Sequence, residues 1–259
     1  MSGKMDLAGK SYWENFQTSG GKLEITFNPR RRNFSDLHRL FERHLPKEAG
    51  LRFLEVGCWP GRFMWYFERY FGYEVSGLDY LESSCRQTEQ FMAAAGVAAR
   101  VICADLFTYV PNTDERWDVV ASFGLVEHFS DSAEVISRHA QLARPGGYVA
   151  IVIPNLQGLY GWILKHTDSE AFRAHQVISL DELKAASAQV TGIRLLEAGY
   201  YGRLGFGHTG IRELAARYGR VAGFAVRAFL FVVESLGQLL PRSRRLSPSI
   251  ALLARREGA

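Results

Sequence analysis

Leu54-Glu55-Val56-Gly57-Cys58-Trp59-Pro60-Gly61-Arg62-Phe63 joins a short apolar run to a glycine turn and then to the start of a helical pattern. A strand, a glycine turn and a helix in this order are how an α/β sheet holds a nucleoside-bearing cofactor, because glycine permits the tight turn and a close approach of the backbone. Glu55 lies just before the turn. Its negative charge suits a cofactor that carries positive charge better than a pyrophosphate, which favours S-adenosylmethionine over NAD.

Apolar runs further along the chain predict the other strands of a parallel sheet. These runs cover residues 73–78, 100–103, 117–122 and 148–153. The first of them stops at Asp79, about twenty residues beyond Gly57, where a doubly wound domain places the acid that binds ribose hydroxyls. The second leads to Asp105. Because the carboxyl ends of parallel strands meet at one edge, we expect Glu55, Asp79 and Asp105 to lie together at the edge where such sheets bind ligands.

The remaining segments predict how the domain is completed. Residues 195–201 are interpreted as a sixth strand and residues 249–254 as the last one. We predict a single domain over residues 1–259. Within it, residues 1–48 are expected to form a helical cap over the cofactor and substrate site, and residues 203–246 a helical insertion between the last two strands.

With these motifs in this order, the chain resembles the small-molecule type of class I S-adenosylmethionine-dependent methyltransferases, over roughly residues 12–255. The family's first motif, Glu/Asp-x-Gly-x-Gly-x-Gly, is matched by Glu55, Gly57 and Gly61, whereas Trp59 replaces the middle glycine. The resemblance implies an α/β fold: a doubly wound, seven-stranded Rossmann-like sheet with its last strand antiparallel and helices on both faces.

The same resemblance implies a set of cofactor-binding residues. Asp79 would hold the ribose, Asp105 and Leu106 would border the adenine, and Phe123 would back the sulfonium end. The full set implied is Glu55, Gly57, Cys58, Trp59, Gly61, Asp79, Tyr80, Asp105, Leu106 and Phe123. Trp59 leaves two alternatives open, a reshaped working loop or a ring that blocks the methionine end.

Two histidines are the candidates for catalysis. A sulfonium methyl is already activated, so the protein must mainly align the acceptor and exclude water, and a general base helps only when the acceptor has a proton to lose. His128, just beyond the fourth strand, is the first candidate for that base and His175 the second. Alternatively, His128 only forms hydrogen bonds at a helix start. Glu127 could orient His128 or bind a cation, although adjacent side chains on a helix diverge.

Aromatic residues in the variable segments indicate the kind of acceptor. Rings that line a pocket suit a flat or apolar small molecule, although many of them could equally belong to the core. The candidates for substrate binding are Tyr12, Trp13, Phe16, Tyr160, Trp162 and Tyr201. The sequence lacks a Pro-Pro-Tyr or Pro-Pro-Phe run after the fourth strand, as well as any Pro-Cys dipeptide, so methylation of nucleic-acid amino groups or of cytosine carbon-5 is unsupported.

We therefore predict an S-adenosylmethionine-dependent N- or O-methyltransferase that acts on a small aromatic or heteroaromatic molecule by in-line displacement, in bacterial specialised metabolism. One alternative acceptor is a sugar or a lipid-linked intermediate. Another alternative is a methyltransferase-like binding protein that has lost catalysis.

The segment from Val221 to Leu240 predicts a helix that is apolar around most of its circumference. Arg220, Arg227 and Glu234 mark one narrow polar stripe along it. Charged groups cost about 2.5 to 3.5 kcal/mol each near a bilayer centre, so we do not expect this helix to span a membrane. The protein's own core, a twin subunit in a homodimer, or a membrane surface beside the basic run 242–245 could cover it.

The composition gives little support to other classes of function, such as nucleic-acid binding. A chain of 259 residues with a net charge of +4 and dispersed basic residues gives little support for binding nucleic acid. Its three cysteines, Cys58, Cys85 and Cys103, lack metal-site spacing and are odd in number, which favours neither a metal site nor a disulfide framework. Residues 1–10 lack the pattern of a secretion signal, and we expect a cytoplasmic protein.

Overall fold

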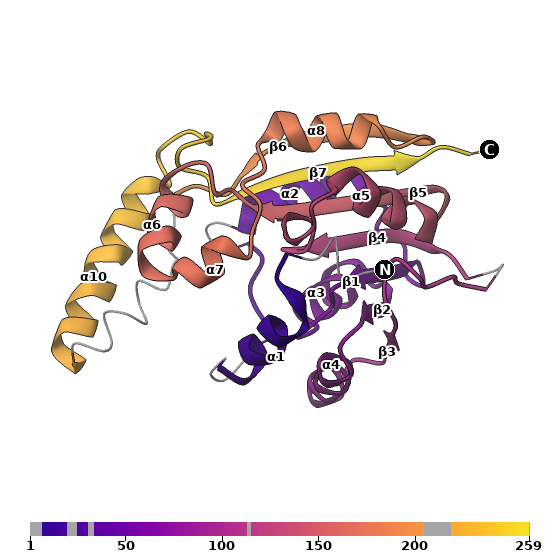
Figure 1. The fold of residues 1–259 in the computed structure, drawn as a ribbon, viewed down its shortest axis with the longest axis horizontal. Coiled ribbons are helices and arrows are strands. Elements are labelled where there is room, and N and C mark those ends of the chain that lie inside the picture. Colours follow the sequence, from indigo (N-terminus) through magenta and orange to yellow (C-terminus); the bar gives the residue numbers. More distant parts are fainter. Residues whose placement is uncertain (1–6, 20–24, 31–33, 113–114, 205–218, 259) are drawn as a thin grey trace.

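The computed structural model describes residues 7–19, 25–30, 34–112, 115–204 and 219–258 (Figure 1). A sheet of seven strands runs through it in the order β3-β2-β1-β4-β5-β7-β6. The strands are β1 Arg52–Val56, β2 Glu74–Asp79, β3 Ala99–Cys103, β4 Trp117–Phe123, β5 Ala143–Pro154, β6 Ile193–Tyr201 and β7 Ser249–Arg256. β1 to β5 pair in parallel, and β7 is antiparallel to both β5 and β6. The predicted fold class is confirmed.

Helices cover both faces of this sheet and extend beyond its edge (Figure 1). They are α1 Gly9–Ser19, α2 Ser35–His44, α3 Arg62–Phe71, α4 Glu82–Ala94, α5 Ser132–Leu142, α6 Leu159–Thr167, α7 Ser169–Arg173, α8 Leu180–Ala188 and α10 Arg220–Gly237, with a 3₁₀ turn, η3, at Val126–His128. Side chains of α2, α3 and α4 share one core with the sheet, and those of α5 and α8 share the other. Successive residues of a strand point to opposite faces, so Phe53 enters the first core and Leu54 the second.

The helices around the site begin at a glycine or at polar capping residues. Gly61 begins α3 with φ +92°, a left-handed conformation that favours glycine. Ser179 and Glu182 form the reciprocal capping box of α8. Asp131 caps α5 by accepting from the backbone N–H of Glu134.

α10 packs on the rest of the protein through one side only. Leu230 joins Ile163 of α6 and Leu204 in a small apolar cluster, and Glu234 is buried on the same side. The opposite side leaves large apolar residues exposed: Phe224, Phe229, Phe231, Val232 and Leu236. The predicted helix is present, and none of the residues that the structure describes covers its outer face. Among the described residues, no helix combines the length and the apolar character needed to cross a bilayer.

Candidate active site

A buried carboxylate, that of Glu55, connects the end of β1 to the helix that follows the glycine turn. Glu55 is 3% exposed, and its Oε2 accepts a hydrogen bond from the backbone N–H of Met64 at 3.0 Å. Burial raises the pKa of Glu55 well above its usual range. Gly57 has φ +71°, and a Cβ placed there would lie 3.0 Å from Leu125 Cδ1, so the loop after β4 packs directly on this turn.

Asp79, the last residue of β2, and Asp105, just after β3, each accept a hydrogen bond from the backbone of the loop that follows. Asp79 Oδ1 accepts from the N–H of Leu81 at 2.9 Å, and Asp105 Oδ1 accepts from the N–H of Phe107 at 2.8 Å. Burial raises the pKa of Asp79 to about 6. Tyr80, next to Asp79, is 41% exposed and is available to a ligand, whereas Leu106 is a buried member of the core under α5 and α8.

Trp59 turns its ring toward α4. Its indole Nε1 donates to Gln87 Oε1 at 2.9 Å. The neighbouring Cys58 is fully buried, and a Cβ at Gly77 of β2 would lie 2.5 Å from its sulfur. The absence of a side chain at Gly77 therefore leaves room for Cys58. This role was not predicted from the sequence, because it depends on the contact between β2 and the turn after β1.

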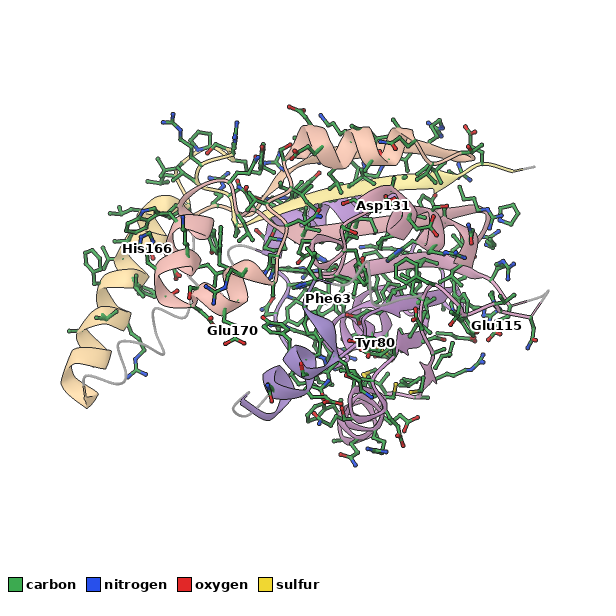
Figure 2. The ribbon with its side chains drawn as sticks, viewed as in Figure 1. Phe63, Tyr80, Glu115, Asp131, His166 and Glu170 are labelled. Atoms are coloured by element: carbon green, nitrogen blue, oxygen red, sulfur yellow. The ribbon has the colours of Figure 1, made fainter. Side chains whose placement is uncertain are left out.

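Two stacked aromatic rings lie at the carboxyl end of β4. Phe123, the last residue of that strand, stacks on Phe63 with ring centroids 3.5 Å apart and planes 10° apart. Phe63 comes from the first turn of α3, just beyond Gly61. Figure 2 places Phe63 and Tyr80 in the same region, between α1 and the sheet. Phe63 thus packs on Phe123, the residue expected to back the sulfonium end of the cofactor.

Both histidine candidates lie together with Glu127 beyond β4. The rings of His128 and His175 have centroids 4.3 Å apart, and His128 Nε2 lies 3.9 Å from Glu127 Oε1. Two backbone contacts hold the segments together: His128 Nδ1 donates to the carbonyl oxygen of Ala174 at 2.7 Å, and the N–H of Gln176 donates to the carbonyl oxygen of Glu127 at 2.6 Å. Among the described residues, no hydrogen bond joins Glu127 to His128, although both belong to the 3₁₀ turn η3 and their side chains come within 3.9 Å of each other.

Burial shifts the proton affinities of this cluster. Desolvation raises the pKa of Glu127 to about 8. Desolvation, with a smaller contribution from His175, lowers the pKa of His128 to about 3. The pKa of His175 is lowered in the same way. His128 also makes the backbone bond that a structural role at a helix start would require, so its role as a base stays a prediction.

The helix α1 lies over this cluster. The N–H of Leu7 donates to the carbonyl oxygen of His128 at 2.8 Å, and the Trp13 ring meets the His128 ring edge-on at 4.6 Å. Tyr12 contacts Trp13 edge-on at 5.1 Å. Gln17 accepts from the Ser83 hydroxyl of α4 at 2.9 Å, so α1 spans from α4 to η3. The side chain of Phe16 lies outside the described residues.

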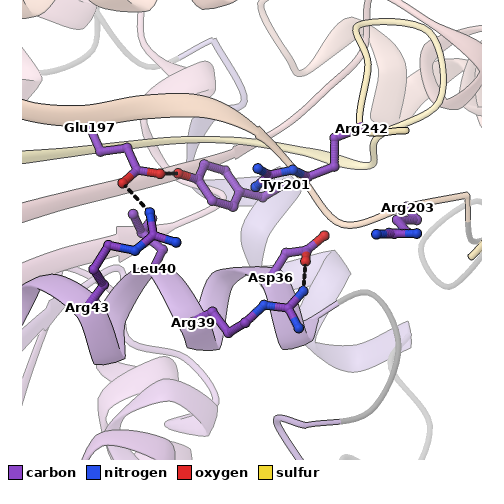
Figure 3. Close-up of a pocket in the computed structure, with 8 residues that line it drawn as sticks. All are labelled: Asp36, Arg39, Leu40, Arg43, Glu197, Tyr201, Arg203 and Arg242. Atoms are coloured by element: carbon purple, nitrogen blue, oxygen red, sulfur yellow. Dashed lines mark hydrogen bonds and ion pairs between the residues drawn. The ribbon is translucent and has the colours of Figure 1, made fainter. Parts of the chain in front are cut away.

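The remaining substrate candidates are not brought together. Tyr160 is buried at the start of α6, whereas Trp162 is 63% exposed and contacts His166 on the same helix. Tyr201 is buried at the end of β6 and donates to Glu197 Oε1 at 2.7 Å. It lines a separate pocket of about 150 Å³ between α2 and β6 (Figure 3). The other residues around that pocket are Asp36, Arg39, Leu40, Arg43, Glu197, Arg203 and Arg242.

The comparisons with known proteins decide the family. A family model described as a methyltransferase domain matches residues 27–200, which include the whole glycine turn and η3. The chain belongs to the class I S-adenosylmethionine-dependent methyltransferases. The seven-stranded order with antiparallel last strands is that of the Rossmann-like methyltransferase fold.

Two relatives match about half of the chain in sequence. The chain is 31% identical over 125 residues to the ubiquinone biosynthesis O-methyltransferase of Leptothrix cholodnii, covering 47% of this chain and 49% of that protein. It is 30% identical over 152 residues to the 27-O-demethylrifamycin SV methyltransferase of Amycolatopsis mediterranei, covering 54% and 53%. The chain thus spans about half the length of these relatives.

Solved structures show the same fold. An N-methyltransferase from Haemonchus contortus, solved with phosphomonomethylethanolamine and S-adenosylhomocysteine, superposes with a TM-score of 0.58. The match covers 86% of this methyltransferase and 52% of that chain at 17% identity. At that identity the likeness concerns the fold, and the acceptor must be inferred from the site.

Proposed function

We propose that this methyltransferase transfers the methyl group of S-adenosylmethionine to an oxygen of a small aromatic molecule. The observation that carries this proposal is Trp13 of α1, whose ring lies edge-on to His128 at 4.6 Å, directly beyond the cofactor end of β4. An aromatic ring over a proton-accepting group suits a flat acceptor with a hydroxyl. The O-methyltransferases among the relatives support oxygen as the atom methylated.

The reaction needs little beyond alignment and removal of one proton. A lone pair of the acceptor oxygen forms the new C–O bond while the C–S bond breaks, and its electrons stay on sulfur as S-adenosylhomocysteine leaves. The hydroxyl proton leaves to a neighbouring base, for which His128 Nε2 is our candidate, since Nδ1 already donates to Ala174. Asp79, whose pKa of about 6 leaves its carboxylate ionised at neutral pH, supplies negative charge for the cationic cofactor.

Calorimetry with S-adenosylmethionine and S-adenosylhomocysteine tests the cofactor site first. Micromolar binding of both is expected, and absence of binding by folded protein would favour the non-catalytic alternative. Catechols, simple phenols and anilines, each supplied with labelled cofactor and followed by mass spectrometry, then separate oxygen from nitrogen acceptors. Methylated anilines without methylated phenols would refute oxygen as the acceptor atom. His128→Ala should lower turnover more than cofactor affinity.

One observation favours a second candidate, an acceptor carried on a lipid. The outer face of α10 exposes Phe229 and Phe231, at 67% and 58%, and the neighbouring helix α6 exposes Trp162. The basic residues Arg242, Arg244 and Arg245 follow the helix and are exposed. Apolar rings flanked by positive charge match an anionic lipid surface, where such a helix can lie in the interface.

Vesicle sedimentation tests this second candidate. Vesicles containing phosphatidylglycerol should retain the protein and pure phosphatidylcholine vesicles should not, and Phe229→Ser with Phe231→Ser should release it. Val110→Ser, at an 82% exposed apolar residue of the β3–β4 connection, is the matched control. Equal retention of the double variant would refute the lipid surface. Elution of the wild type as a dimer that the double variant dissociates would assign this face to a second copy instead.

A further inference from the structure

Glu127, His128 and His175 converge in a way that the base assignment does not explain. One ligand atom from each residue lies within 4.8 Å of the other two. Glu127 is 1% exposed and His128 is 3% exposed. Within the described part of the chain, no other residue donates a hydrogen bond to either carboxylate oxygen of Glu127. An ionised, buried carboxylate without a donor is costly, so a positive partner beside the two imidazoles would stabilise its charge.

The backbone sets which nitrogen of each imidazole faces the carboxylate. His128 Nδ1 bonds the carbonyl oxygen of Ala174 at 2.7 Å, and His175 Nδ1 bonds the carbonyl oxygen of Ala171 at 2.5 Å. A carbonyl only accepts, so both Nδ1 atoms carry the proton and both Nε2 atoms present a lone pair. Ligating histidines are held in this same way, by donating the other ring N–H to a carbonyl oxygen.

Two imidazole lone pairs and one carboxylate form a donor set for a metal ion. Two histidines and a carboxylate bind Zn²⁺ and Fe²⁺ and leave positions open for water or substrate. Ligand atoms around a tetrahedral Zn²⁺ lie about 3.3 Å apart, given bonds of about 2.0 to 2.1 Å. Closing the cluster from 4.8 Å needs a movement of roughly 1 Å or more, within reach of a side-chain rotation in Glu127 or His175.

The cluster also lies beside the predicted methyl donor. Leu125, two residues before Glu127, packs on Gly57 of the glycine turn, and Phe123 is the residue expected to back the sulfonium end. The Trp13 ring meets the His128 ring edge-on, with centroids 4.6 Å apart. An acceptor oxygen bound in an open metal position would thus lie close to both the cofactor turn and the aromatic cap.

We propose that Glu127, His128 and His175 form a three-ligand site for a divalent transition-metal ion, at which a hydroxyl oxygen of the acceptor binds. The identity of the acceptor atom rests on the proposed function, whereas the metal site does not. When bound, the ion would act as a Lewis acid on that oxygen. The three side chains would hold it, and the carbonyls of Ala171 and Ala174 would fix the two rings. His128 Nε2 would then be a ligand and not the base, and the proton of the acceptor hydroxyl, made more acidic by the ion, would leave to solvent.

Metal titration of the full-length apoprotein tests the site without cofactor or acceptor. In a Cys103→Ser background, which removes the exposed thiol, Zn²⁺ calorimetry and visible absorption of added Co²⁺ should each show one site. Glu127→Gln and His175→Ala should each weaken that site by at least about tenfold. His166→Ala, at an exposed histidine of α6 bonded only to its own helix, should leave it unchanged.

The outcomes separate the two proposals. Failure of wild-type protein to bind either ion, or equal binding and equal Co²⁺ spectra in the Glu127 and His175 variants, would overturn the metal site. His175 is partly exposed, so His175→Ala keeps the test decisive where Glu127→Gln does not fold. S-adenosylhomocysteine affinity, measured on the same samples, reports the cofactor site. A loss of cofactor binding with intact metal binding would refute the proposed function and leave the metal site standing.

Discussion

The ring of Trp13 lies edge-on to the ring of His128, at 4.6 Å between centroids and with planes 78° apart. Trp13 comes from the amino-terminal helix and His128 from the turn after β4, so the contact joins the cap to the edge of the sheet. The hydrogen bond from Leu7 to the carbonyl oxygen of His128 strengthens the same junction. The cap therefore encloses the group that the sequence selected for catalysis.

Trp13→Ala should weaken acceptor binding more than cofactor binding. The variant removes a ring that covers His128, and aromatic pairs contribute about 0.5 to 1.5 kcal/mol beyond their buried area. The acceptor KM should rise by about 2- to 12-fold, since 1.4 kcal/mol corresponds to a factor of ten. Steady-state kinetics and S-adenosylhomocysteine calorimetry check this. A larger loss of cofactor affinity than of acceptor affinity would assign Trp13 to the cofactor pocket.

Cofactor binding should fall in acid because of Asp79. Burial raises the pKa of its carboxyl to about 6, so the ionised form that accepts from ribose hydroxyls is lost as the pH falls through 6. We expect S-adenosylhomocysteine affinity to be constant above pH 7 and to decrease steadily below pH 6. Asp79→Ala should weaken binding by about 1 to 3 kcal/mol at pH 7.5 and remove this pH dependence. An unchanged affinity would refute the ribose assignment.

Trp59→Gly restores the family's glycine and tests whether this ring blocks the site. The indole is tied to Gln87 of α4 at 2.9 Å. We therefore expect the variant to bind S-adenosylhomocysteine more weakly, because the turn loses its anchor to α4. Gln87→Ala, which removes the anchor and keeps the ring, should show a smaller loss in the same direction. Tighter binding by Trp59→Gly would instead favour the blocked, non-catalytic alternative.

The sequence predicted the parts of this molecule that local patterns control. Apolar runs bounded by turn residues located all seven strands approximately, because the central strands β1, β4 and β5 and the strand β7 are largely buried and strand ends need glycine or polar groups. Contacts between distant segments were not predicted. Phe63 meets Phe123, and Gly77 makes room for Cys58, only once α3 and β2 lie against the turn.

The substrate candidates show where a simple pattern was overlooked. Tyr160 and Trp162 are both aromatic residues of a variable segment. Two residues apart on a helix point to nearly opposite sides, and the structure buries one and exposes the other. Glu127 was expected to diverge from its neighbour His128, and its carboxylate lies 3.9 Å from His128 Nε2 without a hydrogen bond. Its convergence with His175 depends on the backbone contacts that bring the end of α7 to η3.

Gly77→Ala should destabilise the protein and disturb the cofactor turn together. The new methyl group would lie 2.5 Å from the sulfur of Cys58 and 2.9 Å from that of Met64, both of which are buried. Overpacking of this kind costs about 1 to 3 kcal/mol. Urea unfolding should show that loss, and calorimetry a weaker S-adenosylhomocysteine complex. Gly258→Ala, where a Cβ meets no atom within 4 Å, is the control. Full stability of Gly77→Ala would contradict the packing described.

His139 should make the fold sensitive to mild acid. It is fully buried on α5, its Nδ1 donates to the carbonyl oxygen of Val135 at 2.8 Å, and desolvation lowers its pKa from 6.5 to about 4. Below pH 6.5, His139 is protonated in the unfolded chain, whereas in the folded chain it stays neutral until the pH approaches 4. The free energy of unfolding therefore falls as the pH drops from 6.5 toward 4. The loss attributable to this residue is about 3 kcal/mol, at 1.36 kcal/mol per pKa unit.

The variant His139→Gln isolates that contribution, because glutamine does not titrate. Urea unfolding at pH 7.5 and pH 4.5 should show a larger acid loss for the wild type than for the variant, even though the variant starts from a lower free energy of unfolding. His166→Gln, at an exposed histidine, should follow the wild type at both values. Parallel losses in the wild type and His139→Gln would mean that His139 gains its proton without unfolding. In that case the buried environment of α5 would have to admit water or a counter-charge.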